Sequence, residues 1–182
     1  MVEWIWAIIA LVIIIIIATY NKLISLRNRV KNSWAQIDVQ LKKRFNLIPN
    51  LVDTVKGYAK HEKTVLTDIT KARNMMQKAK DVNAKAAAEN QLSGALKSLF
   101  AVAENYPDLK ASQNFMQLQE ELSGMESKIA YARQFYNDMV MRFNTAIQTF
   151  PTNVFAGVLK FTEQQHFETA GKERENVKVK FD

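Results

Sequence analysis

Residues 4–20, WIWAIIALVIIIIIATY, are an uncharged, strongly apolar run near the start of a 182-residue chain. At about 1.5 Å per residue, a helix of this length spans roughly 25 Å, close to the hydrocarbon thickness of a bilayer. Trp4 and Trp6 at one end and Tyr20 at the other stand where interfacial aromatic residues are found. The run therefore predicts that residues 1–21 comprise a short N-terminal tail and a transmembrane helix.

A cleaved signal peptide and a buried core helix are the two alternatives for this run. A signal peptide has a basic n-region and a small-residue cleavage site. Residues 1–3, Met-Val-Glu, contain no Lys or Arg, and residues 18–20, Ala-Thr-Tyr, do not match an A-x-A site. We therefore expect a retained anchor.

The basic residues next to the run indicate its orientation. None precedes it, whereas Lys22, Arg27, Arg29 and Lys31 follow within a dozen residues. The positive-inside rule then predicts an N-terminus outside and a cytoplasmic chain from Lys22 onwards.

The net charge of +7 is concentrated beside the predicted span, because residues 22–63 hold ten Lys or Arg and three acidic residues. Such a stretch attracts anionic lipid headgroups, so we expect Lys22, Arg27, Arg29 and Lys31 to contact them. Nucleic acid would be the other polyanionic partner. The few aromatic residues here follow an apolar stripe and form no base-stacking platform, so we expect no nucleic-acid binding.

Apolar residues in 22–150 recur at steps of three and four, which is typical of helices that pack against other helices. The longest such stripe runs from Phe115 to Phe150, and a helix of about 40 residues is roughly 60 Å long. A helix of this kind must bury its stripe against partners, in the same chain or in another. The residues expected to pack in the bundle or in an oligomer are Trp34, Ile37, Leu41, Phe115, Leu122, Ile129, Tyr136, Phe143 and Phe150.

The predicted fold class is all-α: a transmembrane helix followed by an elongated antiparallel helical bundle over residues 22–150. Only five Gly and three Pro are present, which favours long helices over sandwiches and barrels. Short loops are expected around residues 58–63, 81–83 and 107–111, with Ser112 as an N-cap. Pro49 interrupts the first stripe and predicts a kink or break near residues 45–48.

The C-terminal tail, residues 151–182, has a different pattern. Residues 177–181, Val-Lys-Val-Lys-Phe, alternate as in a strand. We expect a short extended tail that packs on the bundle, or on a neighbouring subunit by strand addition.

The sequence offers no recognisable catalytic chemistry. The absence of Cys excludes disulfides, thiolate metal sites and a Cys nucleophile, and the five Gly are too scattered for a phosphate loop. His61 and His166 are expected to be solvated. Catalytic, cofactor-binding and metal-binding residues are therefore predicted to be none, with no small-molecule substrate evident and no enzyme activity.

A few polar residues near the longest stripe leave alternatives open. Glu120, Glu121 and Glu126 are expected on a solvated helix face rather than as paired catalytic carboxylates. Arg133, Asn137 and Asn144 lie at the border of the stripe. They are either ordinary flank positions, which we expect, or a buried polar seam that fixes helix register.

Several long segments, in order, resemble the LemA family. They are QLKKRFNLIPNLVDTVKGYAKHE (40–62), FAVAENYPDLKASQNFMQLQEEL (100–122) and ESKIAYARQFYNDMVMRFNT (126–145), and the segments 20–39 and 150–161 fit the same pattern. Residues 45–46, Phe-Asn, depart from the His-Asp pair that is frequent in the family. The tail also lacks the Pro of the family's closing segment.

The resemblance implies a single-pass protein of the bacterial cytoplasmic membrane with an extended helical bundle and no established enzymatic activity. It also implies likeness to a magnetosome membrane component and an association with HtpX-type membrane proteases. Two functions follow as expectations. One is a self-associating, membrane-anchored scaffold, and the other is a monomeric or dimeric adaptor for a membrane enzyme such as an HtpX-type protease in envelope quality control.

Overall fold

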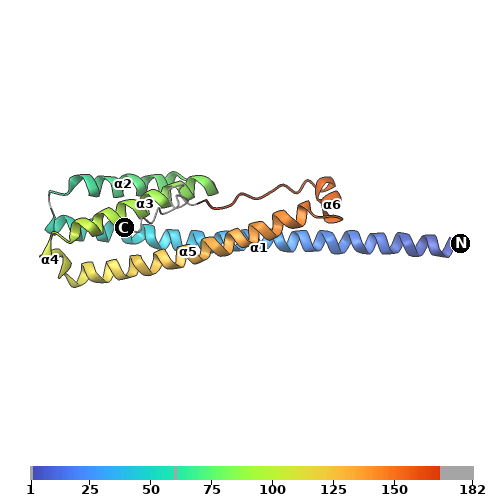
Figure 1. Ribbon diagram of the computed structural model, residues 1–182, viewed down its shortest axis with the longest axis horizontal. Coiled ribbons are helices and arrows are strands. Elements are labelled where there is room, and N and C mark those ends of the chain that lie inside the picture. The colour runs from blue at the N-terminus through green and yellow to red at the C-terminus, as the bar shows by residue number, and fades with distance from the viewer. Residues whose placement is uncertain (1, 60, 169–182) are drawn as a thin grey trace, which may run out of the picture. The chain divides into compact units, whose positions relative to one another are not determined.

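The computed structural model describes residues 2–59 and 61–168. The helices within these ranges are α1 (Val2–Tyr58), α2 (Lys63–Lys78), α3 (Val82–Ala103), α4 (Pro107–Lys110), α5 (Gln113–Gln148) and α6 (Thr152–Val158). The described residues contain no strand, which confirms the all-α class (Figure 1). The strand-like residues 177–181 lie outside the described residues.

The chain forms two compact units, and α1 and α5 contribute to both. Of the described residues, unit 1 comprises 2–38 and 131–166, and unit 2 comprises 39–59, 61–130 and 167–168. This grouping reports which residues pack together. The domain boundaries at 21/22 and 150/151 stay a prediction.

In unit 1, α1 and α5 run antiparallel. The ring centres of Trp34 and Tyr136 lie 5.5 Å apart. Phe161 packs edge-to-face against Phe143 and lies under the guanidinium of Arg27. The residue numbers of contacting partners therefore decrease along α1 as they increase along α5, which is the pattern of an antiparallel pair. The core of the unit is made by buried residues of both helices: Leu23, Val30, Ile37, Ala132, Tyr136, Met139, Val140, Phe143 and Ile147.

In unit 2, α2 and α3 form a hairpin beside the last part of α1 and the first part of α5. Asp81 caps α3 by accepting a hydrogen bond from the backbone N–H of Ala84, 2.8 Å away. The apolar stripes predicted for these helices are buried, for example at Ile69, Leu92 and Leu122. Ser112 directly precedes α5, as expected for its N-cap position.

Pro49 does not break the first helix, because α1 is helical from Val2 to Tyr58 with this proline inside it. Proline costs one backbone hydrogen bond and a steric clash one turn back. Buried Ile48, Leu51, Val52 and Val55 surround it in unit 2. Burial of these side chains offsets the local loss and keeps the helix continuous.

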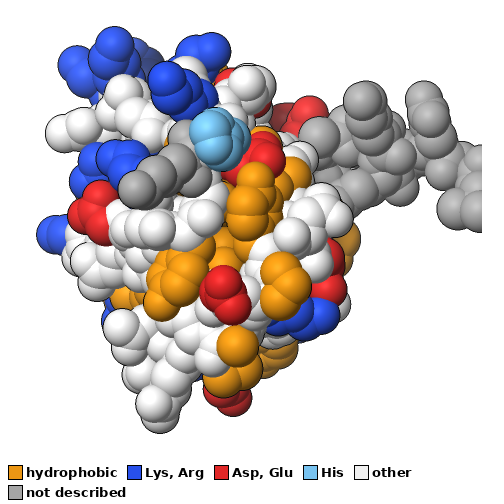
Figure 2. Space-filling model, turned by 90° about the vertical axis from the view of Figure 1, so that its left-hand side faces the viewer, with side chains coloured by type: hydrophobic (Ala, Val, Ile, Leu, Met, Phe, Trp, Pro, Cys, Tyr) orange, Lys and Arg blue, Asp and Glu red, His pale blue; other side chains and the backbone are white. Residues whose placement is uncertain are grey.

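Figure 2 shows the end of unit 2 where α1 ends and α5 begins. Hydrophobic side chains gather in the middle of this face, with Lys and Arg side chains to one side. Tyr58 in the last turn of α1 and Met116 in the first turn of α5 are exposed.

Candidate functional site

The apolar run at the start of α1 has no buried residue. This helix is long and apolar enough to cross a membrane, and the window of residues that meets this test has no buried part. Trp4, Trp6 and Tyr20 are exposed at the two ends of the run. A core helix of a soluble protein would instead be mostly covered.

The four basic residues after the run do not share one environment. Lys22, Arg29 and Lys31 are exposed, as headgroup contact requires. Arg27 is half-buried, and its guanidinium carbon lies 5.5 Å from the ring centre of Phe161. This cation–π contact holds Arg27 against the tail of unit 1 rather than in solvent.

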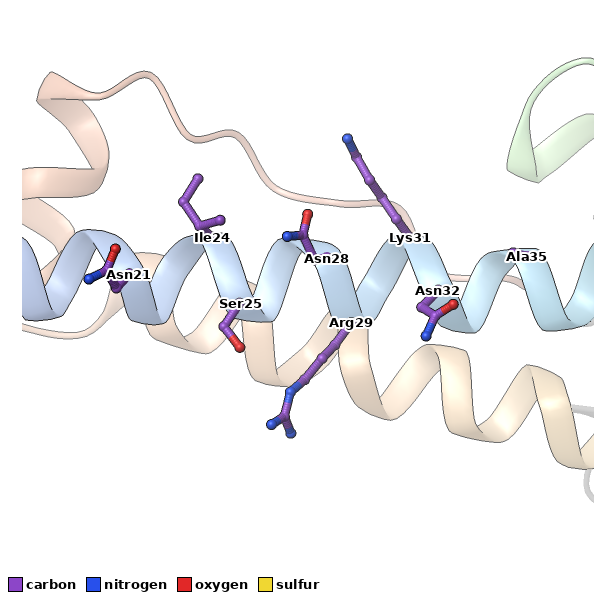
Figure 3. A pocket seen from close by; sticks show the side chains of 8 residues that line it. All are labelled: Asn21, Ile24, Ser25, Asn28, Arg29, Lys31, Asn32 and Ala35. Carbon is purple, nitrogen blue, oxygen red and sulfur yellow. The ribbon is translucent and has the colours of Figure 1, made fainter.

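Exposed polar residues continue the outer face of α1 beyond the run. Asn21, Ser25, Asn28 and Asn32 recur at steps of four, three and four, so they share one face of the helix. Together with Ile24, Arg29, Lys31 and Ala35 they line an open groove of about 730 Å³. Lys31 and Arg29 extend to opposite sides of α1, so cations flank the amides on both sides (Figure 3).

Most of the predicted packing residues are in the core. Ile37, Leu41, Phe115, Leu122, Ile129, Tyr136 and Phe143 are buried, and Trp34 is half-buried against Tyr136. Phe150 differs, since 78% of it is exposed. The buried stripe therefore ends at Ile147, and the expectation that Phe150 packs in the bundle is wrong. A contact of Phe150 in an oligomer stays a prediction.

A buried ionic cluster that sequence reasoning missed joins three helices of unit 2. Arg44 on α1 forms ion pairs with Glu89 on α3 and Glu126 on α5. Its Nη1 also donates to Ser93 Oγ at 3.0 Å, and that hydroxyl donates to Glu126 Oε2 at 3.1 Å. Arg44 and Glu89 are 3% and 1% exposed. Glu126 was expected on a solvated face. Its side chain is 45% exposed, and its carboxylate is paired with Arg44 in this cluster.

One signal pointed to Arg44. The first stripe steps by seven from Leu41 to Ile48, and Arg44 occupies the missing position between them. A charge at a stripe position marks a buried ion pair when a partner exists on another helix. The partner could not be identified from spacing alone.

A second missed feature is the seat of the tail on α5. The side-chain amide of Asn144 donates to the Gln164 carbonyl and accepts from the Gln164 N–H, both at 2.9 Å. Tyr136 Oη donates to the Gln165 carbonyl at 2.9 Å. The side chain of Asn144, expected as a flank residue, thus binds the backbone of an extended segment.

Two tyrosines have shifted acidity. The hydroxyl of Tyr106 donates to Glu62 at 2.8 Å, which raises the pKa of Tyr106 because the neutral phenol is the donor. Burial raises the pKa of Tyr136. Both effects favour uncharged phenols and neither creates a catalytic acid or base at neutral pH.

A second groove lies in unit 2, between the end of α1 and α2. It is lined by Lys56, Lys63, Leu66, Thr67, Thr70, Lys71 and Asn74. Lys56 and Lys71 lie 3.8 and 3.6 Å from Asp53 and Asp68 of their own helices, so this groove is only mildly cationic.

The described residues contain no group of three or more His, Cys, Asp or Glu placed to hold a metal ion. His61 and His166 are exposed, as are Glu120 and Glu121. The expectation of no catalytic, cofactor or metal site stays a prediction.

Comparison with known proteins identifies a family and several relatives. The sequence pattern of the LemA family matches residues 33–181. Protein LemA of Metamycoplasma hominis is 31% identical over 162 residues, covering 86% of this chain and 72% of the relative.

More distant relatives are magnetosome proteins. MamQ 2 of Paramagnetospirillum magneticum is 23% identical over 175 residues, covering 82% of this chain and 64% of the relative. MamQ of Magnetospirillum gryphiswaldense is 22% identical over 174 residues, covering 81% and 64%. The chain thus spans less than two thirds of these two relatives. The family match over most of the chain, with the LemA relative at 31% identity, shows that the chain belongs to the LemA family.

Proposed function

We propose that the protein is a non-enzymatic scaffold that α1 anchors in the bacterial cytoplasmic membrane and that self-associates there. The observation that carries this proposal is the exposed apolar run, which continues without a break into the core helix of unit 1. A continuous helix transmits the position of the span directly to the folded unit. The relatives named as magnetosome proteins support a role at a membrane.

The charge next to the run supports an orientation with the N-terminus outside. Lys22, Arg29 and Lys31 are exposed within about three turns of Tyr20, whereas the described residues before the run hold no Lys or Arg. In this orientation the chain from Lys22 onwards is cytoplasmic.

Anionic lipid headgroups are the proposed partner of the groove on α1. Asn21 and Ser25 follow Tyr20 within about two turns, so they lie at headgroup depth if α1 spans the bilayer. Their side chains donate hydrogen bonds to phosphate oxygens, and the nearby cations add roughly 1 kcal/mol each.

Self-association is supported by an exposed aromatic pair in unit 1. Tyr131 and Phe135 lie one turn apart on α5 and are 73% and 38% exposed. Aromatic residues are enriched at the centre of protein interfaces and are unfavourable in water. We assign this face of α5 to contact between copies of the chain.

Single-cysteine cross-linking in native membranes tests this contact, because the chain has no Cys of its own. A bifunctional maleimide should link copies of Tyr131→Cys into dimers. Gln91→Cys, at an exposed polar position on α3, is the control and should link far less. Equal yields at the two positions would contradict an interface at Tyr131.

The adaptor function is the second candidate, favoured by the groove between α1 and α2. Its lysines and Leu66 fit an acidic, partly apolar segment of a partner protein. In that case a specific membrane protein, such as an HtpX-type protease, would co-purify in near-equal amount. Lys63→Glu together with Lys71→Glu should then release the partner, whereas Lys97→Glu, outside the groove, should not.

A further inference from the structure

The residues around α6 expose apolar side chains that unit 1 does not cover. Phe150 is 78% exposed and Val158 is 77% exposed, and Val154 and Leu159 are also exposed. Val154 and Val158 are one turn apart on the outer face of α6, whereas Ala156 is buried on the inner face. Exposed apolar side chains gathered on so short a segment call for a covering partner.

The packing of α1 against α5 determines the level of this surface along α1. Trp34 is opposite Tyr136, and Arg27 is level with Phe143 through their shared contact with Phe161. Both helices rise by about 1.5 Å per residue, so this antiparallel register continues and places Phe150 opposite Tyr20. Tyr20 is the last residue of the exposed apolar run. Figure 1 accordingly shows α6 beside the blue part of α1, with the dark blue N-terminal end extending beyond it.

From this alignment we propose that Phe150, Val154, Val158 and Leu159 insert into the lipid–water interface, as a second membrane contact of the chain. The proposal rests on α1 spanning the bilayer. Short segments with exposed apolar residues and a nearby cation lie in the interfacial plane, with the cation at the phosphate level. Lys160 directly follows Leu159 and supplies that cation.

Lipid fits this surface better than a protein partner. The surface is continuous in level with the apolar run, so lipid reaches it wherever the run is embedded. It also consists of only four side chains on and beside a seven-residue helix, well below the area of a stable protein interface.

Fluorescence quenching in vesicles tests the insertion. The full chain carries one NBD-labelled cysteine at Val158→Cys, Val12→Cys or Gln134→Cys, in vesicles of phosphatidylethanolamine and phosphatidylglycerol. Val12 lies in the apolar run, and Gln134 is exposed on α5, about 24 Å along the helices from the level of Tyr20. We expect shallow doxyl lipids to quench the label at 158 severalfold more than at 134, and aqueous iodide to quench it severalfold less.

The other outcomes each overturn the proposal in a distinct way. If the label at 158 is as accessible to iodide as that at 134 while the label at 12 is quenched by deep doxyl lipids, α6 lies in water and the anchor stands. If the label at 158 is protected from both quenchers, a second protein chain covers α6. If the label at 12 is also quenched by iodide, the anchoring by α1 has failed.

A second label guards against a local effect of the cysteine. Val154→Cys lies on the same face of α6 and should report the same shallow depth as Val158→Cys. Discordant depths at the two positions would contradict the insertion of this face.

Discussion

Arg44 is the central residue of the buried ionic cluster in unit 2. It is buried with Glu89 and paired with Glu126, so one guanidinium ties α1, α3 and α5 together. An ion pair of this kind adds little net stability over an apolar core, but the loss of one partner leaves an uncompensated buried charge. The cluster therefore specifies which helix faces meet.

Replacement of this arginine should be strongly destabilising. Arg44→Ala leaves the Glu89 carboxylate buried without its ion-pair partner and should lower the free energy of unfolding by about 3–5 kcal/mol. Urea unfolding in mild detergent, followed by circular dichroism, measures the change. Arg142→Ala, an exposed arginine on α5, is the control and should cost no more than about 0.5 kcal/mol.

A double variant tests whether that loss comes from the uncompensated charge of Glu89. Arg44→Met with Glu89→Leu removes both charges and should recover much of the stability lost by Arg44→Ala. If Arg44→Ala costs less than about 1 kcal/mol, the cluster does not hold the helices as described.

Tyr136 predicts an alkaline limit to stability. Its pKa is raised in the folded state, so above about pH 10 the unfolded chain loses this proton first. The contribution of Tyr136 is complete below that pH and is lost as the pH rises through the folded-state pKa. Stability of the native chain should thus fall more steeply above pH 10 than that of Tyr136→Phe.

At neutral pH, Tyr136→Phe should cost about 0.5–1.5 kcal/mol through the lost hydrogen bond to Gln165. Tyr131→Phe removes the hydroxyl of an exposed tyrosine and is the control. It should change neither the stability at neutral pH nor its fall above pH 10. A spectrophotometric titration of the phenols checks the shift directly. The titration of Tyr136→Phe should lack a phenol of raised pKa. If it lacks a phenol of ordinary pKa instead, the shift at Tyr136 is contradicted.

Single residues mark the limit of what the sequence predicts. Apolar spacing located Ile37, Leu122 and Phe143 in the core, because burial of a stripe is the main driving force of helix packing. The same reasoning put Glu126 in solvent and left Glu89 unnoticed. Whether a charge is buried depends on a partner from another helix, and spacing along one helix carries no information on that partner.

Among the helices, α1 shows how packing overrides a local signal. Pro49 predicted a kink or a break. The helix does not break there but continues to Tyr58, and the kink stays a prediction. The stretch around Pro49 is secured by buried neighbours rather than by backbone hydrogen bonds alone. The α1–α2 connection lies within the predicted range 58–63. The α2–α3 connection is residues 79–81, two residues earlier than the predicted 81–83, because Asp81 already caps α3.

The tail is an element whose position depends on side chains of another helix. Residues 161–165 follow α5 through Asn144, Tyr136 and the ring contact of Phe143 with Phe161. Its own sequence contained no periodic signal for this segment. The position of this segment can therefore be predicted only once the position of α5 is known.

Asn144→Ala should release this segment. The change removes two hydrogen bonds to the backbone of Gln164 and leaves its N–H and C=O without that partner, at a local cost of about 1–3 kcal/mol. Hydrogen exchange should accelerate at residues 162–166 and stay unchanged in α3. Asn153→Ala, on α6, is the control, and equal exchange in both variants would show that Asn144 does not hold the tail.

For the whole molecule, orientation is the first open property. A reporter that is active only in the cytoplasm, fused after Asp182, should be active if the cations beside the run set the topology. Substitution of Lys22, Arg29 and Lys31 by Gln should weaken this preference. An export-dependent reporter that is active at the same position would contradict the cytoplasmic placement.

Self-assembly in the membrane is the central claim, and the mass of the complex in native lipid particles tests it most directly. We predict discrete particles whose protein mass is a multiple of the 20.9 kDa chain. A Tyr131→Lys and Phe135→Lys double variant should shift them towards single chains, whereas Gln91→Lys, at an exposed position on α3, should not. Single 20.9 kDa chains at every concentration would contradict the scaffold, and a stable one-to-one complex with another membrane protein would establish the adaptor in its place.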